Sequence, residues 1–245
     1  LYRRGKADFS EEATGLRQLE IYNAVFRMER NRRDGARDGV LICGAYGFGN
    51  TGDDAILQAI IGEMRRIDAH MPVTVLSRRP KDTQRTFGVN ACHRFGVFAI
   101  RRVMRRSQLF ISGGGSLMQD VTSRLSLWYY LSTIRMAHGC GCKVQMYGCG
   151  IGPIVYARDK KLAAHVINTC VDKITLREPD SRETLRDFGV TGPEVILASD
   201  PALTLPAAEH SRIDSILRAH DMDIGGKYIG FVLRKWPGME EKATV

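Results

Sequence analysis

Short apolar segments alternate with amphipathic segments from residue 40 to residue 199. The apolar segments are predicted to be strands, at residues 40–43, 73–76, 109–112, 143–148, 173–177 and 194–199. Apolar residues spaced three and four apart predict helices between them, at residues 54–68, 98–106, 123–138, 158–170 and 179–189. Strands that alternate with helices favour a parallel sheet covered on both faces, so we expect a doubly wound, mainly parallel, Rossmann-like α/β domain.

This alternating region is predicted to be one domain, residues 39–205. Before it, residues 10–30 repeat apolar positions with helical spacing and a polar segment follows. We therefore expect residues 1–38 to form an N-terminal helical extension and a basic linker. The chain starts at Leu1 rather than at Met, which suggests that further residues precede it.

A linker helix and a second domain are predicted after residue 205. The linker spans residues 206–226, with a polar helix at about 208–220, and residues 227–245 begin a truncated second domain. Residues 227–236 have the apolar pattern of a strand, and nine residues follow them. A parallel strand needs a crossover of a dozen or more residues to reach its neighbour. We expect this strand to pack weakly and to expose an apolar patch at Ile229, Phe231 and Leu233.

The composition is typical of a globular protein, with 44% hydrophobic and 26% charged residues. No apolar run approaches the ~18 residues that span a bilayer, and no signal-peptide pattern follows Leu1. The six cysteines lie mostly in apolar or glycine-rich segments, which favours reduced thiols over a disulfide framework. These features predict a cytoplasmic protein.

The net charge of +9 is concentrated in residues 65–106, which hold eleven Arg and Lys but two acidic residues. Such a basic face attracts anionic lipid, acidic polymers or nucleic acid, and a solvated helix face is the alternative. No nucleic-acid-binding motif is present, so we expect no nucleic-acid partner. We expect peripheral contact with anionic membrane at the inner face of the plasma membrane, through four arginines at helical spacing: Arg101, Arg102, Arg105 and Arg106.

Polar or glycine-rich segments follow five of the predicted strands. Ligands of doubly wound sheets bind beyond the carboxyl ends of the strands. The sequence therefore predicts one site where these segments meet. They are "GAYGFGNTGDD" (44–54), "GGGSLMQDVTS" (113–123), "GCGIGP" (148–153), "REPDS" (177–181) and "SDPAL" (199–203).

The first segment has the glycine spacing of a dinucleotide-binding loop, at residues 47–52. The acidic residue expected about 20 positions later is missing, so NAD binding is not expected. Asp53 and Asp54 suit the start of a helix, but they disfavour a pyrophosphate and favour hydroxyl groups. We therefore expect this loop to receive a sugar hydroxyl beside Asp53, with Gly47, Asn50 and Gly52 as binding residues.

The second segment predicts an anion-binding nest. Gly113, Gly114 and Gly115 leave backbone amides accessible beside Ser116, although an ordinary strand-to-helix turn is the alternative. Further along, Asp120 and Ser123 are candidates for a hydroxyl acceptor and a helix cap. We expect both residues to lie at the site, with Ser123 as a binding residue.

Arg177 ends a predicted buried strand, where a cation needs a partner. It is expected to bind a carboxylate or phosphate, or alternatively to pair with Glu178 or Asp180. Ser181 is a further candidate binding residue. No metal site is expected, because the spacing of Cys140, Cys142 and Cys149 fits no zinc pattern.

These five segments, in this order, resemble the polysaccharide pyruvyl transferase family, in particular its CsaB type, over residues 40–236. The resemblance implies a GT-B-like architecture, with an active site between two Rossmann-like domains. This chain is then the N-terminal half, and the C-terminal half is missing. The extension before residue 39 departs from the family pattern.

The implied reaction moves pyruvate from phosphoenolpyruvate onto a sugar of a cell-wall polysaccharide or of its lipid-linked precursor. The product is a cyclic ketal, and phosphate is released. Arg177 and the amides of residues 113–116 would bind phosphoenolpyruvate, the co-substrate, and no cofactor is implied. Asp53 and Asp120 would orient or deprotonate sugar hydroxyls.

In the family, a histidine and further cations are expected in the second domain, so the chain alone is predicted to be inactive. Two other functions remain open at this point. One is a GT-B glycosyltransferase that uses a nucleotide sugar, and the other is a non-catalytic polysaccharide-binding module.

Overall fold

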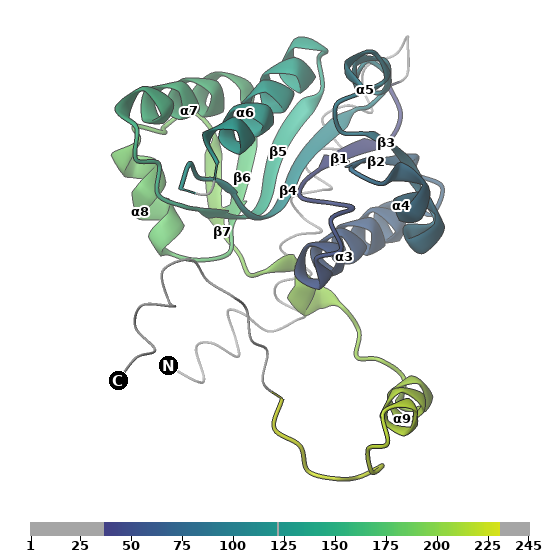
Figure 1. Ribbon diagram of the computed structural model, residues 1–245. Helices are drawn as coiled ribbons and strands as arrows, with labels where there is room; N and C mark the ends of the chain where they lie inside the picture. Colours follow the sequence, from purple (N-terminus) through teal and green to yellow (C-terminus); the bar gives the residue numbers. More distant parts are fainter. Residues whose placement is uncertain (1–36, 122, 231–245) are drawn as a thin grey trace, which may run out of the picture. The chain divides into compact units, whose positions relative to one another are not determined.

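The structure is a computed structural model that describes residues 37–121 and 123–230 (Figure 1). It divides into two compact units, Leu1–Leu205 and Pro206–Val245. The helix predicted at residues 10–30, the linker up to residue 36 and residues 231–236 of the last predicted strand lie outside the described residues. Residues 227–230 are described and have no regular secondary structure. In the second unit, α9 (His210–Ala219) corresponds to the predicted polar helix.

The first unit is built on a seven-stranded sheet in which every neighbouring pair of strands is parallel. The strand order is β3-β2-β1-β4-β5-β6-β7, so the prediction of a doubly wound parallel sheet is confirmed. The order reverses between β1 and β4, and sheets of this kind bind ligands at that switch point. The strands are β1 (Val40–Cys43), β2 (Val73–Ser77), β3 (Asn90–His93), β4 (Leu109–Met118), β5 (Lys143–Ile151), β6 (Lys173–Leu176) and β7 (Glu194–Leu197).

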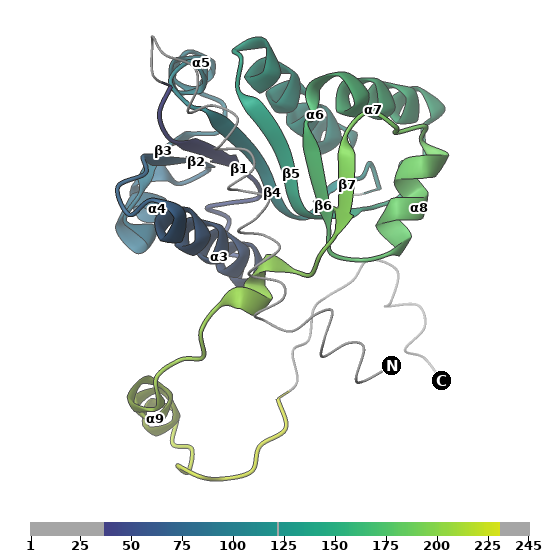
Figure 2. The ribbon, with the colours of Figure 1, turned by 180° about the vertical axis from the view of Figure 1, so that it is seen from behind.

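Helices cover both faces of the sheet (Figures 1 and 2). On one face, apolar residues of α6 and α7 join those of β4 and β5 in a buried cluster. On the other, α3 packs on β1, β2 and β4. Burial on both faces explains why the strands are almost continuously apolar. The helices are α3 (Thr51–Ile67), α4 (Pro80–Phe87), α5 (Val97–Met104), α6 (Arg124–Gly139), α7 (Ala157–Cys170) and α8 (Asp180–Asp187), with a short 3₁₀ helix η1 (Pro201–Thr204).

Two elements, α4 and β3, were not predicted from the sequence. The helix α4 is polar and buries Thr83 alone, so it has almost no apolar periodicity. Pro80 in its first turn and Gly88 at its C-cap, with φ of 62°, set its ends. The strand β3 lies at the edge of the sheet and reads "NACH", with no run of large apolar residues.

The central strands β4 and β5 are longer than predicted. The sequence placed their ends at residues 112 and 148, and both boundaries are wrong, because the strands continue to Met118 and Ile151. Their pairing continues through Gly115 opposite Cys149. The glycine run therefore lies within β4 and not in a turn after it. Glycine is required there partly because Gly114 has φ of +71°, and a Cβ at this position would overlap Ile56 of α3.

Candidate functional site

The loop that leaves β1 is fixed to the sheet at two points. Tyr46 is buried, and its hydroxyl donates a hydrogen bond to the carbonyl of Gly113, at 2.9 Å. Gly47 has φ of +77°, and a Cβ there would overlap the Ser77 hydroxyl at the end of β2. Gly47 therefore lets the loop lie close to β2, while Tyr46 attaches it to β4.

Asp53 lies at the switch point, between the start of α3 and β4. Asn50 is the N-cap of α3: its Oδ1 accepts a hydrogen bond from the Gly52 amide at 3.1 Å, and its Nδ2 donates to Asp53 Oδ2 at 2.6 Å. On the β4 side, a Cβ on Gly115 would lie 3.4 Å from Asp53 Oδ1. Asn50, Gly52, Asp53 and Gly115 are therefore brought together, and we call them the Asp53 corner.

Asp120 is only 5% exposed and has a different environment from Asp53. Its Oδ1 accepts a hydrogen bond from the amide of Val155 at 2.8 Å, and its Oδ2 accepts one from the amide of Tyr156 at 3.1 Å. Both carboxylate oxygens thus hold the segment between β5 and α7. These bonds give Asp120 a positioning role, and the catalytic role expected from the sequence stays a prediction.

Two predicted binding serines form hydrogen bonds within the protein. Ser123 is the N-cap of α6 and accepts a hydrogen bond from the Ser126 amide at 3.3 Å. Ser181 is buried, donates to Glu178 Oε1 at 2.9 Å and accepts from the Ile151 amide at 2.8 Å. The Ser181 hydroxyl is thus engaged as donor and as acceptor, whereas the bond between Ser123 and the Ser126 amide uses the Ser123 oxygen as an acceptor. A binding role for either serine stays a prediction.

Arg177 follows β6 and joins groups from two other strand ends. Its Nη1 donates to Asp200 Oδ2 at 2.9 Å, and its Nη2 donates to the Ser116 hydroxyl at 3.2 Å. The expected alternative, a pair with Glu178 or Asp180, is wrong. Asp200 follows β7 and also accepts from the Ala202 amide at 3.0 Å, which caps η1.

Gly150 of β5 completes this group. A Cβ on Gly150 would lie 2.7 Å from Glu178 Oε1, 2.9 Å from the Ser116 hydroxyl and 3.3 Å from Arg177 Nε. Ser116, Gly150, Arg177, Glu178 and Asp200 therefore lie together at the carboxyl ends of β4 to β7, and we call them the Arg177 cluster. Because Gly115 and Ser116 are consecutive, β4 connects this cluster to the Asp53 corner.

The structure shows a packing role for part of the glycine run, whereas its predicted role in binding stays a prediction. A Cβ on Gly113 would lie 2.8 Å from Ile60 Cδ1, and one on Gly114 would overlap Ile56. These two glycines allow α3 to pack closely on β4. Gly115, next to Asp53, and Ser116, bonded to Arg177, are the members of the segment that face polar groups.

The comparison with known families agrees with this arrangement. The family model described as polysaccharide pyruvyl transferase matches residues 50–241, which include the Asp53 corner and the Arg177 cluster. The chain belongs to the polysaccharide pyruvyl transferase family. It is therefore assigned to a family of transferases, as the resemblance implied. No curated protein matches the chain.

Solved structures resemble this pyruvyl transferase family member only distantly. Two are crystal structures of Anabaena HepE, one with UDP-glucose (8% identity, TM-score 0.48) and one with UDP and glucose (8% identity, TM-score 0.41), each covering 75% of this chain and 50% of that chain. A third is a ribokinase-like superfamily protein from Enterococcus faecalis V583, with 10% identity, a TM-score of 0.38, and coverage of 69% and 61%. This chain thus spans half the length of the HepE chain. Likenesses this weak support no conclusion about function.

The cysteines of this pyruvyl transferase family member are free thiols. Burial raises the pKa of Cys43 to about 11 and that of Cys149 to about 12, so both thiols are neutral at pH 7 and poor nucleophiles. Within residues 37–121 and 123–230, no group of three or more His, Cys, Asp or Glu side chains could hold a metal ion. The same part of the chain has no helix that is both long and apolar enough to cross a lipid bilayer.

Proposed function

We propose that this protein transfers pyruvate from phosphoenolpyruvate onto a sugar of a cell-wall polysaccharide or its lipid-linked precursor, as a CsaB-type enzyme. The observation that carries the proposal is the family match over residues 50–241. Arg177 supports it, since phosphoenolpyruvate has both a phosphate and a carboxylate and needs a cationic donor.

Arg177 is the group we assign to phosphoenolpyruvate. A guanidinium has five N–H donors, and the bonds to Asp200 and Ser116 use two of them. Its side chain is 27% exposed, so the remaining donors can reach a ligand. Asp200 and Ser116 fix the orientation of the guanidinium, and Gly150 keeps the space beside its Nε open.

Asp53 is the group we assign to the sugar acceptor. Pyruvyl transfer adds two sugar hydroxyls to the central carbon of phosphoenolpyruvate. One hydroxyl proton ends on the methylene carbon, which becomes a methyl group, and the other leaves with inorganic phosphate. A carboxylate beside the hydroxyls can accept and relay these protons. Asp120 contributes by holding the segment between β5 and α7, and phosphoenolpyruvate is the one co-substrate, with no cofactor.

The cytoplasmic face of the plasma membrane is the proposed location, with contact through α5. Phe98 is 90% exposed, and it lines a surface pocket with Arg101, Arg102, Arg105 and Arg106. An exposed aromatic side chain beside several arginines is typical of helices that bind the interface of anionic membranes. A lipid-linked acceptor would be presented at that surface.

The direct test is phosphate release from phosphoenolpyruvate by a protein that contains this whole chain, with amino-sugar acceptors. The proposal predicts equal amounts of phosphate and of acceptor carrying a pyruvate ketal, detected by mass spectrometry. Transfer of a sugar from a nucleotide sugar, with no ketal, would instead show a glycosyltransferase.

A further inference from the structure

A second group of cations lies at the carboxyl ends of β2 and β3, on the other side of β1 from the Arg177 cluster. Arg78 follows β2, and Arg94 follows β3. The Cζ atoms of both arginines lie 5.2 Å from the ring centroid of Phe48, which belongs to the loop after β1. Phe48 is 47% exposed, so a partly exposed aromatic side chain lies beside two cations.

Arg94 is held in place by aromatic side chains. Its Cζ lies 4.3 Å from the ring centroid of Tyr129 and 5.2 Å from that of Phe95. The Tyr129 hydroxyl donates to the backbone carbonyl of Arg94 at 3.1 Å. Arg94 Nε is buried and has no hydrogen-bond partner among the described residues. Its aromatic neighbours therefore fix the position of the guanidinium.

Neither of these two cations forms an ion pair with a carboxylate in the described part of the chain. Ion pairs there involve Arg66, Arg124, Lys143, Lys173 and Arg177, but neither Arg78 nor Arg94. Two cations outside these ion pairs, at the carboxyl ends of the strands, create a positive potential that favours an anion. The partly exposed aromatic ring beside them adds an apolar surface.

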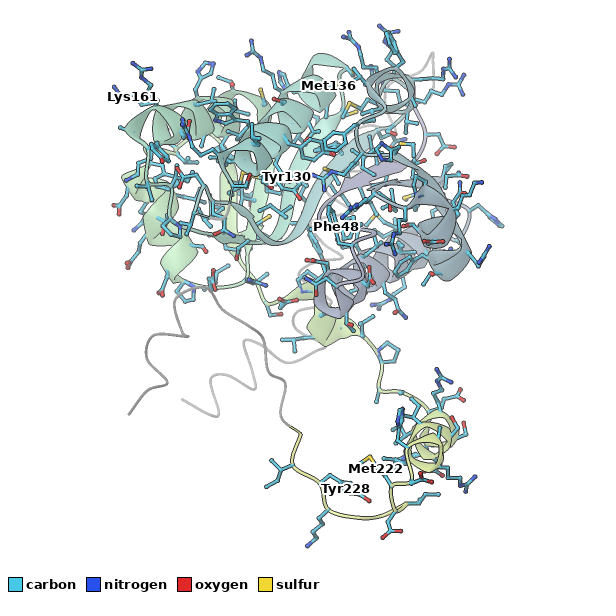
Figure 3. The ribbon with its side chains drawn as sticks, in the orientation of Figure 1. Phe48, Tyr130, Met136, Lys161, Met222 and Tyr228 are labelled. Carbon is cyan, nitrogen blue, oxygen red and sulfur yellow. The ribbon has the colours of Figure 1, made fainter. Side chains whose placement is uncertain are left out.

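This group lies next to the Asp53 corner. Phe48 is two residues before Asn50, whose side chain bonds to Asp53. The ring centroids of Tyr129 and Tyr130 are 5.1 Å apart. Burial raises the pKa of Tyr130 to about 12, and the charge of Asp53 contributes in the same direction. Figure 3 labels Phe48 beside the start of α3 and Tyr130 on α6.

We propose that Phe48, Arg78, Arg94, Phe95 and Tyr129, which we call the Phe48 platform, bind the acceptor as an anionic saccharide. One sugar ring packs on Phe48, and an anionic substituent, a phosphate or a carboxylate, binds Arg78 and Arg94. The inference rests on the proposed function in that the same saccharide presents its hydroxyls to Asp53. It assigns a charged acceptor to this chain, in place of a neutral one.

The first test is isothermal titration calorimetry of the wild-type chain, which needs no turnover. The probes are N-acetylglucosamine 1-phosphate, glucuronic acid, neutral N-acetylglucosamine and inorganic phosphate. We expect at least one of the two anionic sugars to bind about tenfold or more tightly than both the neutral sugar and inorganic phosphate. The affinities of the two anionic sugars then show whether the site prefers a phosphate or a carboxylate as the anionic substituent.

Matched variants test whether the anionic sugar binds at the Phe48 platform. Phe48→Ala and Arg78→Gln should each weaken the better anionic sugar about fivefold to tenfold. Arg79→Gln and Leu125→Ala are the controls, since both residues are exposed and neither has a cation–π contact with Phe48, and they should leave the affinity within about twofold.

Equal affinity for the neutral and the anionic sugars would overturn the inference. An equal change in saccharide affinity in Arg78→Gln and Arg79→Gln would also overturn it. So would a loss of affinity for phosphoenolpyruvate while the affinity for the saccharide stays unchanged. Failure of the proposed function is a separate result, because it would appear as absent ketal formation while the binding measurements stay readable.

Discussion

At the scale of single residues, two aspartates at the same edge of the sheet have opposite surroundings. Both oxygens of Asp120 accept backbone amides, so Asp120→Asn would place an amide group against an N–H donor. We expect this change to lower the free energy of unfolding by about 1–3 kcal/mol. Urea unfolding followed by circular dichroism measures the loss.

Asp53→Asn should have the reverse effect. Asp53 lies in the first turn of α3, where its charge favours the helix by only about 0.3–1 kcal/mol. We expect little loss of stability but a large fall in the rate of acceptor use, because an amide cannot accept the hydroxyl proton. If Asp53→Asn costs as much stability as Asp120→Asn and leaves the rate unchanged, Asp53 serves only to cap the helix.

At the scale of elements, the contact between α3 and β4 depends on the absence of a side chain at Gly114. Gly114→Ala would combine a positive φ with an overlap against Ile56, and we expect it to destabilise the protein by about 3 kcal/mol. Gly49→Ala is the matched control, since its φ is +77° but nothing lies within 4 Å of the added Cβ. It should cost about 1 kcal/mol from backbone strain alone. Thermal unfolding of both variants compares them, and equal losses would show that the close approach of α3 is unimportant.

The helix α5 should bind anionic vesicles. Replacing Arg101, Arg102, Arg105 and Arg106 by Gln should reduce sedimentation with phosphatidylglycerol vesicles by about tenfold or more, since each arginine near such a surface contributes about 1 kcal/mol. Added salt should have the same effect. The corresponding change at Arg182 and Arg186 of α8 is the control. Vesicle binding that ignores both salt and the α5 changes would leave these arginines as a solvated surface.

The elements also show what sequence reasoning can and cannot predict. Buried strands such as β1 and β6 were predicted closely, because short apolar runs between polar helices are typical of the inner strands of a parallel sheet. The edge strand β3 and the polar helix α4 escaped prediction, since neither has a clear apolar pattern. The extension of β4 was missed because its glycines resemble a turn. These glycines are required instead by the close packing of α3 on β4, which is a tertiary contact.

The location of the candidate site was predictable from the sequence, but the contacts between its residues were less so. The strand-end rule correctly placed Asp53 and Arg177 at the same edge of the sheet. The pair between Arg177 and Asp200 spans 23 residues of sequence and needs β6 beside β7. The "SDPAL" segment was a signal for Asp200, yet the sequence did not indicate which group it contacts. The contact between Arg94 and Phe48 was likewise not predictable from the sequence, because it depends on how the fold places the loops after β1 and β3.

At the scale of the whole molecule, stability should depend on pH through Asp159, which joins α7 to α6. Its oxygens accept from Arg124 Nε at 2.7 Å and from Trp128 Nε1 at 3.1 Å. The bond from Arg124 lowers the pKa of Asp159 from its ordinary value of 3.8. A lowered carboxyl pKa stabilises the fold above that ordinary value, and this stabilisation is lost as the pH falls through the folded-state pKa.

The wild-type free energy of unfolding should therefore fall more steeply than that of Asp159→Asn between about pH 5 and about pH 2, and the two curves should converge at the acid end. Urea midpoints measured across this range give the comparison. Parallel curves would show that Asp159 does not contribute to the acid sensitivity of the protein.

Pyruvyl transfer is proposed to occur where the Arg177 cluster meets the Asp53 corner. The most direct measurement is phosphate release as a function of phosphoenolpyruvate concentration, with wild type, Arg177→Ala and the exposed control Arg182→Ala in a protein that contains this whole chain. We predict that Arg177→Ala raises the KM for phosphoenolpyruvate by about tenfold or more and leaves the KM for the acceptor nearly unchanged, with Arg182→Ala like wild type. A folded Arg177→Ala protein with wild-type constants for both substrates would contradict this assignment of the site.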